Sequence, residues 1–589
     1  MLVLWACVLI VPFLIPAHFY PLPTYPEELV TTILVVGFGI AGVFSTKRRV
    51  YVSNLMMLWL VAGIIWYISW FFNKKEVVSG ALFYQIFWVV GFFALIGSSA
   101  LIARIGKQQF STLSARVLVF SGFLYAMTGL FTYYGGLKFI IPWISVDQSR
   151  LVGFMGHPNL SGLYLAISLS AFGFALSKKI NRPLQLQSIV FVLIVTLAGV
   201  LTGSRAFFVI LIAQCLFGAV WYFLLRGGMA SSRACVKAPF FYQLFVLGLS
   251  GILFVAYPPT DRIISESLAE HEILNRQSTS EMLMGRYQAA GQPRLGEWRK
   301  IVQGIEVIPN IWLGVGPGSY PEFSVAADEV IDNPYRNGKT WRNAHNIFLM
   351  AFVEWGIIGC IFVFSLFLYI FYLFVKSEKS IENYFIWLSL TAIIIHNLVE
   401  FSLWHMQFLI VFLVLLTSQV KIYALRLTSP SLRWVSVVPV VILTIWMSFM
   451  TSLDYARMVY LFSKPEIGAE DIRTLDLVAQ NSLWRPYSRL VMYYRLNPIA
   501  TGIEGQLNEA TAIAHWSPLN LVLMRQASLT AAVGESALAC KRINRATELY
   551  PSIAATLDEE LVYLNSQNLL VMLEEMRACF KMIDDPKGG

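Results

Sequence analysis

The sequence predicts an all-α, multi-pass membrane protein that carries a long polar loop and a C-terminal helical domain. Three observations support this class. The chain of 589 residues is 57% hydrophobic and has a mean hydropathy of +0.63. Only 13% of its residues are charged, whereas soluble domains average about a quarter. Apolar segments of about 17–25 residues, long enough to cross a bilayer, recur from Leu2 to about Ser452.

About thirteen apolar segments are predicted to span the membrane, with an error of one or two. Those before the long polar loop are Leu2–Phe19, Leu29–Phe44, Val50–Phe72, Gly80–Ala103, Arg116–Tyr134, Asn159–Leu176, Gln187–Leu201, Ala206–Leu225 and Phe240–Tyr257. Those after it are Ile347–Val375, Ile381–Val399, Leu403–Val420 and Val435–Ser452. The first segment is followed at once by further spans and has poor cleavage signals, so we expect a retained anchor.

Lysine and arginine residues predict the orientation of these spans. An excess of these residues marks the cytoplasmic side of a membrane protein. With a cytoplasmic N-terminus, the basic loops all fall on the cytoplasmic side; they hold Lys47–Arg49, Arg104, Lys107, Lys178–Arg182, Arg226, Arg233, Lys237, Lys376, Lys379, Lys421, Arg426 and Arg433. The net charge of +9 therefore reflects topology, and no nucleic-acid partner is expected.

This orientation divides the chain into four parts. Residues 1–257 form an N-terminal transmembrane bundle, residues 258–344 a loop on the far side, residues 345–452 the C-terminal transmembrane helices, and residues 453–589 a far-side helical domain. We expect the chemistry on the face that the loop and the tail share. The loop segment GVGPGSY (Gly314–Tyr320) lacks the Gly-Lys-Ser/Thr ending of a phosphate-binding P-loop. We expect a Gly/Pro turn that holds the loop against the membrane.

The tail is predicted to be helical, because prolines punctuate its amphipathic stretches. Its residues Ala539, Ile543, Ala546 and Pro551 match the spacing of the second half of a tetratricopeptide (TPR) repeat, and Gly534 fits the turn between the two helices. Two interpretations stay open: a cap that steadies the long loop, or a docking surface for a protein partner. The basic residues that could make such a surface are Arg525, Lys541, Arg542 and Arg545.

Two residues stand where polar chemistry meets the membrane. His345 precedes the apolar run that begins at Ile347, where it is either an interfacial hydrogen-bonding group or an acid–base catalyst. Arg205 lies between two apolar runs, which costs on the order of 3 kcal/mol unless the side chain snorkels, is solvated or is paired. Snorkelling and an anionic ligand are the two explanations. Glu354, inside the apolar run, is expected to brace its helix against a partner.

The long loop adds further cationic side chains in GRYQAAGQPRLGEW (Gly285–Trp298), which holds Arg286 and Arg294. Arg294 and Trp298 are four residues apart, so on a helix they share a face. Arginine suits phosphate because its guanidinium group is planar, always charged and donates in bidentate fashion. We find no metal-ligand spacing and no Gly-x-Ser-x-Gly motif on this face. The inventory is several arginines and one histidine, and no metal or cofactor is expected.

Four further stretches stand out along the chain: LTGSRAFF (Leu201–Phe208), RLGEW (Arg294–Trp298) followed by PNIWLGVGPGSYPEF (Pro309–Phe323), NAHNIFLMAFVEWGIIG (Asn343–Gly359), and GHPNLSGLYLA (Gly156–Ala166) with HNLVEFSLWHMQFL (His396–Leu409). In these stretches and their order, the sequence resembles the O-antigen ligase/polymerase superfamily, and most closely its PglL-type bacterial protein O-oligosaccharyltransferase branch, which glycosylates pilins. The tail resembles the periplasmic helical domain of that branch more loosely.

The resemblance implies a metal-independent glycosyltransferase in the bacterial inner membrane, with its active site facing the periplasm. The donor would be an oligosaccharide on undecaprenyl pyrophosphate, and the acceptor a Ser/Thr hydroxyl of a periplasmic protein such as a pilin. The resemblance assigns catalysis to His345, Arg205 and Arg294. It assigns substrate binding to Arg286, Trp298, Arg342, His157, Asn159, Glu400 and His405. The branch usually has glutamine at the position of His157, so His157 receives no catalytic role.

The sequence also allows other functions. Within the family, an O-antigen ligase acting on lipid A-core and an O-antigen polymerase differ only in the acceptor. A multispan transporter would place its polar groups near the bilayer midplane and show internal repeats, and we see no repeat. A scaffold that only presents the tail would not need Arg205, Arg294 and His345 around one rim.

Overall fold

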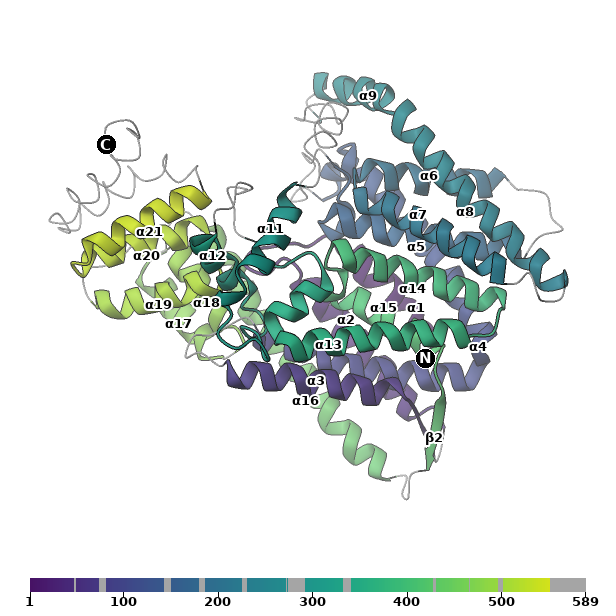
Figure 1. The fold of residues 1–589 in the computed structure, drawn as a ribbon, viewed down its shortest axis with the longest axis horizontal. Coiled ribbons are helices and arrows are strands. Elements are labelled where there is room, and N and C mark those ends of the chain that lie inside the picture. Colours follow the sequence, from purple (N-terminus) through teal and green to yellow (C-terminus); the bar gives the residue numbers. More distant parts are fainter. Residues whose placement is uncertain are drawn as a thin grey trace.

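The computed structural model describes residues 1–46, 49–73, 81–141, 150–178, 186–224, 230–271, 273, 292–331, 341–426, 431–464, 467–481, 483–495 and 502–550. Apart from one two-stranded ribbon, the regular structure in these ranges is helical (Figure 1), which confirms the predicted all-α class. The predicted site residue Arg286 lies outside the described residues. So does Pro551 of the predicted repeat.

The helices of the first half are α1 (Leu2–Ile10), α2 (Tyr25–Val43), α3 (Leu55–Phe72), α4 (Ala81–Tyr133), α5 (Pro158–Ser177), α6 (Leu186–Leu201), α7 (Arg205–Leu224) and α8 (Ala230–Ala256). Next come α9 (Pro258–Glu270), α11 (Gln292–Gln303), α12 (Tyr320–Val330), α13 (Ile347–Lys376), α14 (Ile381–Val399), α15 (Met406–Thr417) and α16 (Ser431–Ser463). The tail holds α17 (Ala469–Gln480), α18 (Arg485–Arg495), α19 (Ile503–Trp516), α20 (Asn520–Ala532) and α21 (Ser536–Leu549).

Among the described residues, 8 helices are long and apolar enough to cross a membrane, so the chain is a multi-pass membrane protein. Each predicted span overlaps a helix, although the number of crossings stays a prediction. One of the 8 is α4, which joins two predicted spans and is broken at Gly106, where φ is 79°. Helices of 18 residues or more are what a bilayer of about 30 Å requires.

Two predicted spans need correction at their ends. The first does not reach Phe19, because helical structure stops at Leu14, where a short 3₁₀ turn (Val11–Leu14) contains a proline and a second proline follows at position 16. Proline disfavours helix at the residue before it. The third does not begin at Val50, because Arg49–Ser53 is strand β1. The β-branched and aromatic residues of that stretch favour extended backbone.

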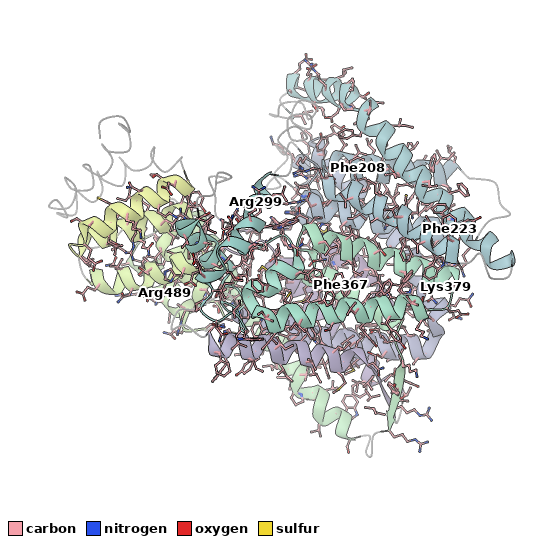
Figure 2. The ribbon with its side chains drawn as sticks, viewed as in Figure 1. Phe208, Phe223, Arg299, Phe367, Lys379 and Arg489 are labelled. Carbon is pink, nitrogen blue, oxygen red and sulfur yellow. The ribbon has the colours of Figure 1, made fainter. Side chains whose placement is uncertain are left out.

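The bundle has two distinct ends, because α5, α13 and α14 each run from one to the other. Lys178 follows α5 and pairs with Glu382 in the first turn of α14, beside the end of α13; we call this the basic end. At the same end β1 pairs antiparallel with β2 (Ile422–Arg426). The other end, near the tail, we call the tail end. Figure 2 labels Lys379 at the basic end and Arg299 close to the tail.

The tail helices pack in sequence as hairpins beside the tail end (Figure 1). Gly534 lies in the turn between α20 and α21 with φ 89°, and Ala539, Ile543 and Ala546 are buried. These positions are the ones that the repeat pattern selects, while the TPR assignment itself stays a prediction. Tyr25 at the start of α2 contacts Tyr455 of α16 with tilted rings at a centroid distance of 4.4 Å, and Trp484, just before α18, edge-on at 5.1 Å. These contacts join the bundle to the start of the tail.

The Gly-rich segment of the long loop packs on a break in α13. Gly356 has φ 67° and ψ −161°, which frees the Val353 and Glu354 carbonyls to accept from Val315 N–H at 2.8 Å and Gly316 N–H at 3.1 Å. A Cβ atom on Gly314 would lie 2.4 Å from the Val353 oxygen, so only glycine fits. The side chain of Glu354 accepts from Gly318 N–H at 2.8 Å. The loop is therefore held against the bundle. Glu354 was predicted to brace its own helix, and the structure shows its side chain bound to the loop.

Candidate active site

Glu400 is the centre of a polar cluster at the tail end. It directly follows α14 and is 2% exposed. Its Oε1 atom accepts from the Arg294 guanidinium and from the Asn159 side-chain amide. Its Oε2 atom lies 3.5 Å from Nδ1 of His345. Three residues that the sequence assigns to the site, from three separate segments, thus meet at the carboxylate of a fourth.

His345 is held in an unusual backbone conformation. Its φ is 50°, the left-handed region that a residue with a side chain rarely adopts. Its N–H donates to the Asn343 side chain at 3.0 Å, and the next residue, Asn346, caps α13 by accepting from two backbone N–H groups. The imidazole stacks on the Phe401 ring at 5.2 Å. Such local strain persists where the surroundings define a functional conformation.

Arg294 and Trp298 both serve this cluster from the first half of α11. Arg294 reaches Glu400, and Trp298 Nε1 donates to the Ala344 carbonyl at 2.8 Å. The predicted shared face of α11 is confirmed. Since Ala344 directly precedes His345, α11 sets both the guanidinium and the backbone beside the imidazole.

Arg150 connects the cluster to the turn before α7. Its Nε donates to the Thr202 carbonyl at 2.7 Å, and its Nη2 donates to the Gly203 carbonyl at 3.2 Å and to Asn159 Oδ1 at 3.1 Å. No sequence motif assigned Arg150 to the site. The structure therefore brings the Thr202–Arg205 turn to the site through Arg150. The Arg205 side chain itself is exposed, on the first residue of α7.

The histidines beside the cluster surround Phe401. The rings of His157 and His405 lie 5.6 Å and 5.5 Å from its centroid. Burial, and then the charges of Arg150 and Arg294, lower the pKa of His157 to about 4. Burial, and then His157, lower the pKa of His405 to about 3. Both imidazoles are therefore neutral at physiological pH.

The predicted substrate-binding residue Arg342 makes none of the described contacts to Glu400. Arg342 is exposed, and its charge is felt at Tyr84 and Tyr487, on the side of α4 and α18. Arg286 lies outside the described residues. An exposed cation on the rim is still available to an anionic ligand, so the assignment of Arg342 stays a prediction.

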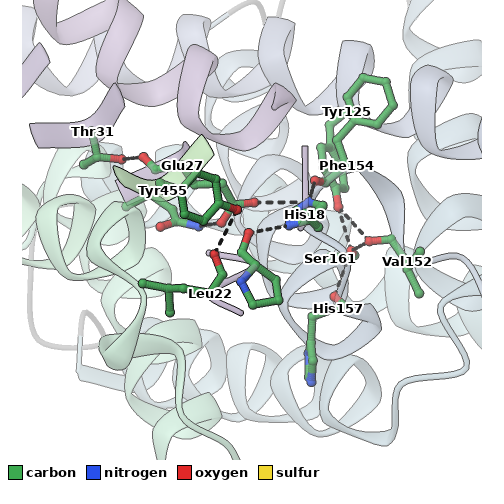
Figure 3. Close-up of polar contacts among 12 residues, drawn as sticks. His18, Leu22, Glu27, Thr31, Tyr125, Val152, Phe154, His157, Ser161 and Tyr455 are labelled. Carbon is green, nitrogen blue, oxygen red and sulfur yellow. Dashed lines mark hydrogen bonds and ion pairs between the residues drawn. The ribbon is translucent and has the colours of Figure 1, made fainter. Parts of the chain in front are cut away.

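A second polar network contacts the loop that precedes α5 (Figure 3). Ser161 Oγ donates to the Val152 carbonyl at 2.6 Å, and His18 Nε2 lies 3.6 Å from Glu27 Oε1. Gln407, near the start of α15, donates to the other oxygen of Glu27 at 2.9 Å. The His157 imidazole points away from these contacts. The network joins the N-terminal segment to the loop that carries His157, since His18 also contacts the Phe154 carbonyl. Ser161 and Gln407 lie in the quoted stretches Gly156–Ala166 and His396–Leu409, whereas no motif indicated His18 or Glu27.

Five of the site residues lie at or near helix N-termini. His157 and His405 are the N-cap residues of α5 and α15, Arg205 begins α7, Arg294 is in the first turn of α11, and His345 precedes the N-cap of α13. Each helix N-terminus carries a partial positive charge and unpaired N–H groups. Their arrangement around two arginines suits an anionic ligand such as pyrophosphate.

Glu400 is the single acidic side chain that the described contacts place in this cationic cluster. Burial raises the pKa of Glu400, and the charges of Arg294 and Arg150 and the hydrogen bonds of Arg294 and Asn159 oppose that shift. An ionised Glu400 facing Nδ1 favours the tautomer in which Nδ1 carries the proton. Nε2 is then the basic nitrogen of His345. The cluster can thus pair a general base with preorganised positive charge.

The fold and site together define a multi-pass, all-α membrane protein with an Arg–Glu–His cluster at one end of its bundle. Comparison with protein families supports this class of membrane protein. A model described as O-Antigen ligase matches residues 189–364, and one described as Virulence factor membrane-bound polymerase, C-terminal, matches residues 384–560. The chain belongs to the O-antigen ligase/polymerase superfamily, as its motifs indicate. No curated protein and no solved structure matches the chain.

The two family matches divide the site between them. The first contains Arg205, Arg294 and His345, and the second contains Glu400 and His405. The family is one of membrane enzymes that transfer glycans from lipid-linked donors. Asn159 and Arg150 precede both matched segments. The assignment to the protein-glycosylating branch stays a prediction.

Proposed function

We propose that this protein transfers an oligosaccharide en bloc from undecaprenyl pyrophosphate to a Ser/Thr hydroxyl of a periplasmic or pilin protein. The observation that carries the proposal is the contact of Glu400 with both Arg294 and His345. It joins an anion-binding group and a base on one carboxylate, at a site rimmed by helix N-termini. Family membership supplies the glycan-transferring chemistry.

The chemistry follows from these residues. The acceptor hydroxyl oxygen attacks the anomeric carbon of the donor, and His345 Nε2 takes the hydroxyl proton. The bond between the anomeric carbon and the pyrophosphate oxygen breaks, and its electron pair leaves with the lipid pyrophosphate. Arg205, Arg294 and the helix N-termini stabilise that leaving group. Glu400 stabilises the imidazolium that forms on His345.

A single displacement inverts the configuration at the anomeric carbon. A double displacement needs a free carboxylate nucleophile near that carbon. Glu400 does not fit this role, because both of its oxygens are engaged, one by Arg294 and Asn159 and the other facing His345. We therefore propose inversion without a covalent glycosyl-enzyme.

We further propose that the tail end faces the periplasm in the bacterial inner membrane. Two observations support this orientation. The basic loops at Lys178 and Lys379 lie at the opposite end of α14 from Glu400, and basic loops favour the cytoplasm. Cys540 on the tail helix α21 is disulfide-bonded, which is typical of an oxidising compartment.

The proposed acceptor is a protein rather than lipid A-core. The support comes from the segments Gly156–Ala166 and His396–Leu409, which resemble the protein-glycosylating branch, and from the added tail. The tail's basic residues are a weaker argument than the sequence suggested, because Arg525 is 6% exposed and the Arg545 side chain is 12% exposed. These two cannot form an open docking surface, which favours the cap interpretation for this part of the tail.

The test is reconstitution of the purified full-length protein with an undecaprenyl-pyrophosphate-linked glycan, followed by mass spectrometry of the products. A pilin, lipid A-core and free glycan are offered in parallel, with and without EDTA. The proposal predicts a glycosylated Ser/Thr peptide, undiminished by EDTA. Glycosylated lipid A-core or an extended glycan with no modified protein would instead support a ligase or a polymerase. No transfer to any acceptor would overturn the enzyme assignment.

A further inference from the structure

Helix α11 makes contacts on two of its faces. On one face, Arg294 and Trp298 contact the site through Glu400 and Ala344. On the other face, Glu297 and Lys300, three residues apart, contact α12. The contacts between this second face and α12 therefore help to determine where α11 lies relative to the site.

A buried charge network fills this second face. Lys300 is 3% exposed, and its Nζ lies 2.9 Å from Glu297 Oε2 and 3.0 Å from Asp328 Oδ1. The other oxygen of Glu297 accepts from the Tyr320 hydroxyl at 2.9 Å and from Ser324 at 2.7 Å. Breaking a buried ion pair is strongly unfavourable, because one charge is left without a partner. The network thus fixes α11 to α12 in one orientation.

The same network continues into the tail through Asp328. Its Oδ1 faces Lys300, and its Oδ2 lies 3.5 Å from Arg545 Nη2 on α21. Arg545 also donates to the Val325 carbonyl of α12 at 2.8 Å. The tail therefore contacts the helix that supports α11, and the contact is made by a side chain that is 12% exposed.

We propose that Lys300 and Arg545 are positioning residues for the active site. The contacts Arg545–Asp328, Asp328–Lys300 and Lys300–Glu297 hold α11 in position. Helix α11 in turn places Arg294 against Glu400 and Trp298 against the Ala344 carbonyl, next to His345. The tail then contributes to glycan transfer by positioning α11, although none of its residues in these contacts touches the site. The catalytic meaning of this inference depends on the proposed function, whereas the mechanical coupling does not.

The variants that test the proposal are Arg545→Ala and Arg545→Lys in the full-length protein. Lysine keeps the charge toward Asp328, so it should restore much of what alanine loses. The matched control is Arg489→Ala. Arg489 is also a tail arginine paired with carboxylates, Asp476 at 2.6 Å and Glu509 at 3.6 Å, but these pairs lie within the tail.

The first readout is hydrogen exchange, which does not depend on activity. Arg545→Ala should speed exchange in residues 292–303 and 341–349, and Arg489→Ala should leave both segments as in the wild type. Unchanged exchange at 341–349 in Arg545→Ala would overturn the coupling. Because this readout needs no substrate, it decides the coupling even if no glycan transfer is found.

The second readout is the transfer rate at saturating donor and acceptor. Arg545→Ala should lower kcat about tenfold, with Arg545→Lys closer to the wild type. Trp298→Phe removes the hydrogen bond to Ala344 while keeping an aromatic ring. If Arg545 acts through α11, the double variant should be no slower than the slower single variant. Multiplying effects, or a change confined to KM, would overturn the proposal.

If Arg545→Ala does not purify as a folded protein, Arg545→Lys is compared directly with Arg489→Lys. Lysine reaches less far and cannot donate as a planar fork, so its exchange at 341–349 should still exceed that of the control. Equal exchange in these two variants would contradict the inference.

Discussion

Glu400 Oε2 lies 3.5 Å from Nδ1 of His345, although one residue follows α14 and the other precedes α13. The carboxylate holds Arg294 through its other oxygen. Glu400→Gln removes the charge that both partners face. We expect kcat/KM for the lipid-linked donor to fall by about 10²-fold or more, in the range that a positioned base contributes.

The matched control for this variant is Glu382→Gln. Glu382 lies at the other end of α14, where it pairs with Lys178 at the basic end. It should leave transfer within about twofold of the wild type, since this pair lies at the opposite end of α14 from Glu400 and its lysine is partly exposed to solvent. Equal losses in the two variants would show that charge removal on α14 acts through general destabilisation.

Arg150 gives a second prediction, because it joins Asn159 to the turn before Arg205. Arg150→Lys keeps the positive charge but cannot make the three contacts at once. Loss of charge-assisted hydrogen bonds worth about 1.5–3 kcal/mol corresponds to a fall of about 10–150-fold in kcat/KM for the donor. Lys138→Ala, an exposed basic residue of the same inter-helix region, should show no such fall in the same assay.

Glu354 gives a prediction about stability. Its side chain accepts from Gly318 N–H and so holds the Gly-rich segment on α13. Glu354→Ala removes the acceptor and should destabilise the protein by about 1–3 kcal/mol. Glu354→Gln keeps a carbonyl oxygen and should cost less. Thermal unfolding of the detergent-purified variants measures the order, and an alanine variant as stable as the glutamine variant would contradict this role.

His157 gives a prediction about pH. Its pKa is lowered to about 4 in the folded protein, below the usual 6.5. Between these values the unfolded chain binds the proton more readily, so His157 lowers stability as pH falls from 6.5 toward 4. His157→Gln cannot titrate. It should lose less thermal stability between pH 7.5 and 5.0 than the wild type.

The control here is His271→Gln, a histidine with an exposed side chain at the end of α9. Its loss of thermal stability over the same pH interval should match that of the wild type. If His157→Gln also matches the wild type, the buried neutral state assigned to His157 is wrong.

Much of the fold follows from local pattern. The apolar segments become helices because their length and hydropathy leave few alternatives in a bilayer. The shared face of Arg294 and Trp298 follows from helical periodicity. Glycine spacing likewise indicated the turn at Gly314, although the sequence could not show that Val353 lies against it. That contact depends on the break at Gly356, which no periodicity reveals.

The site itself was predicted only in part. His345 and Arg294 stood out as titratable or charged residues beside apolar runs, so their positions suggested chemistry. The role of Arg150 depends on a contact between two loops that are distant in sequence, Arg150 with Thr202. Glu400 was assigned to substrate binding by resemblance. Its near-complete burial and its bonds to Arg294 favour positioning of the catalytic groups instead.

The most direct test of the central claim is the single-turnover rate of glycan transfer by purified His345→Ala, with the donor saturating and the variant confirmed as folded in the membrane. If His345 Nε2 is the base, the rate should fall by at least about 10²-fold, while binding of the lipid-linked donor stays within a few-fold of the wild type. Transfer by His345→Ala at the wild-type rate would contradict the proposed mechanism.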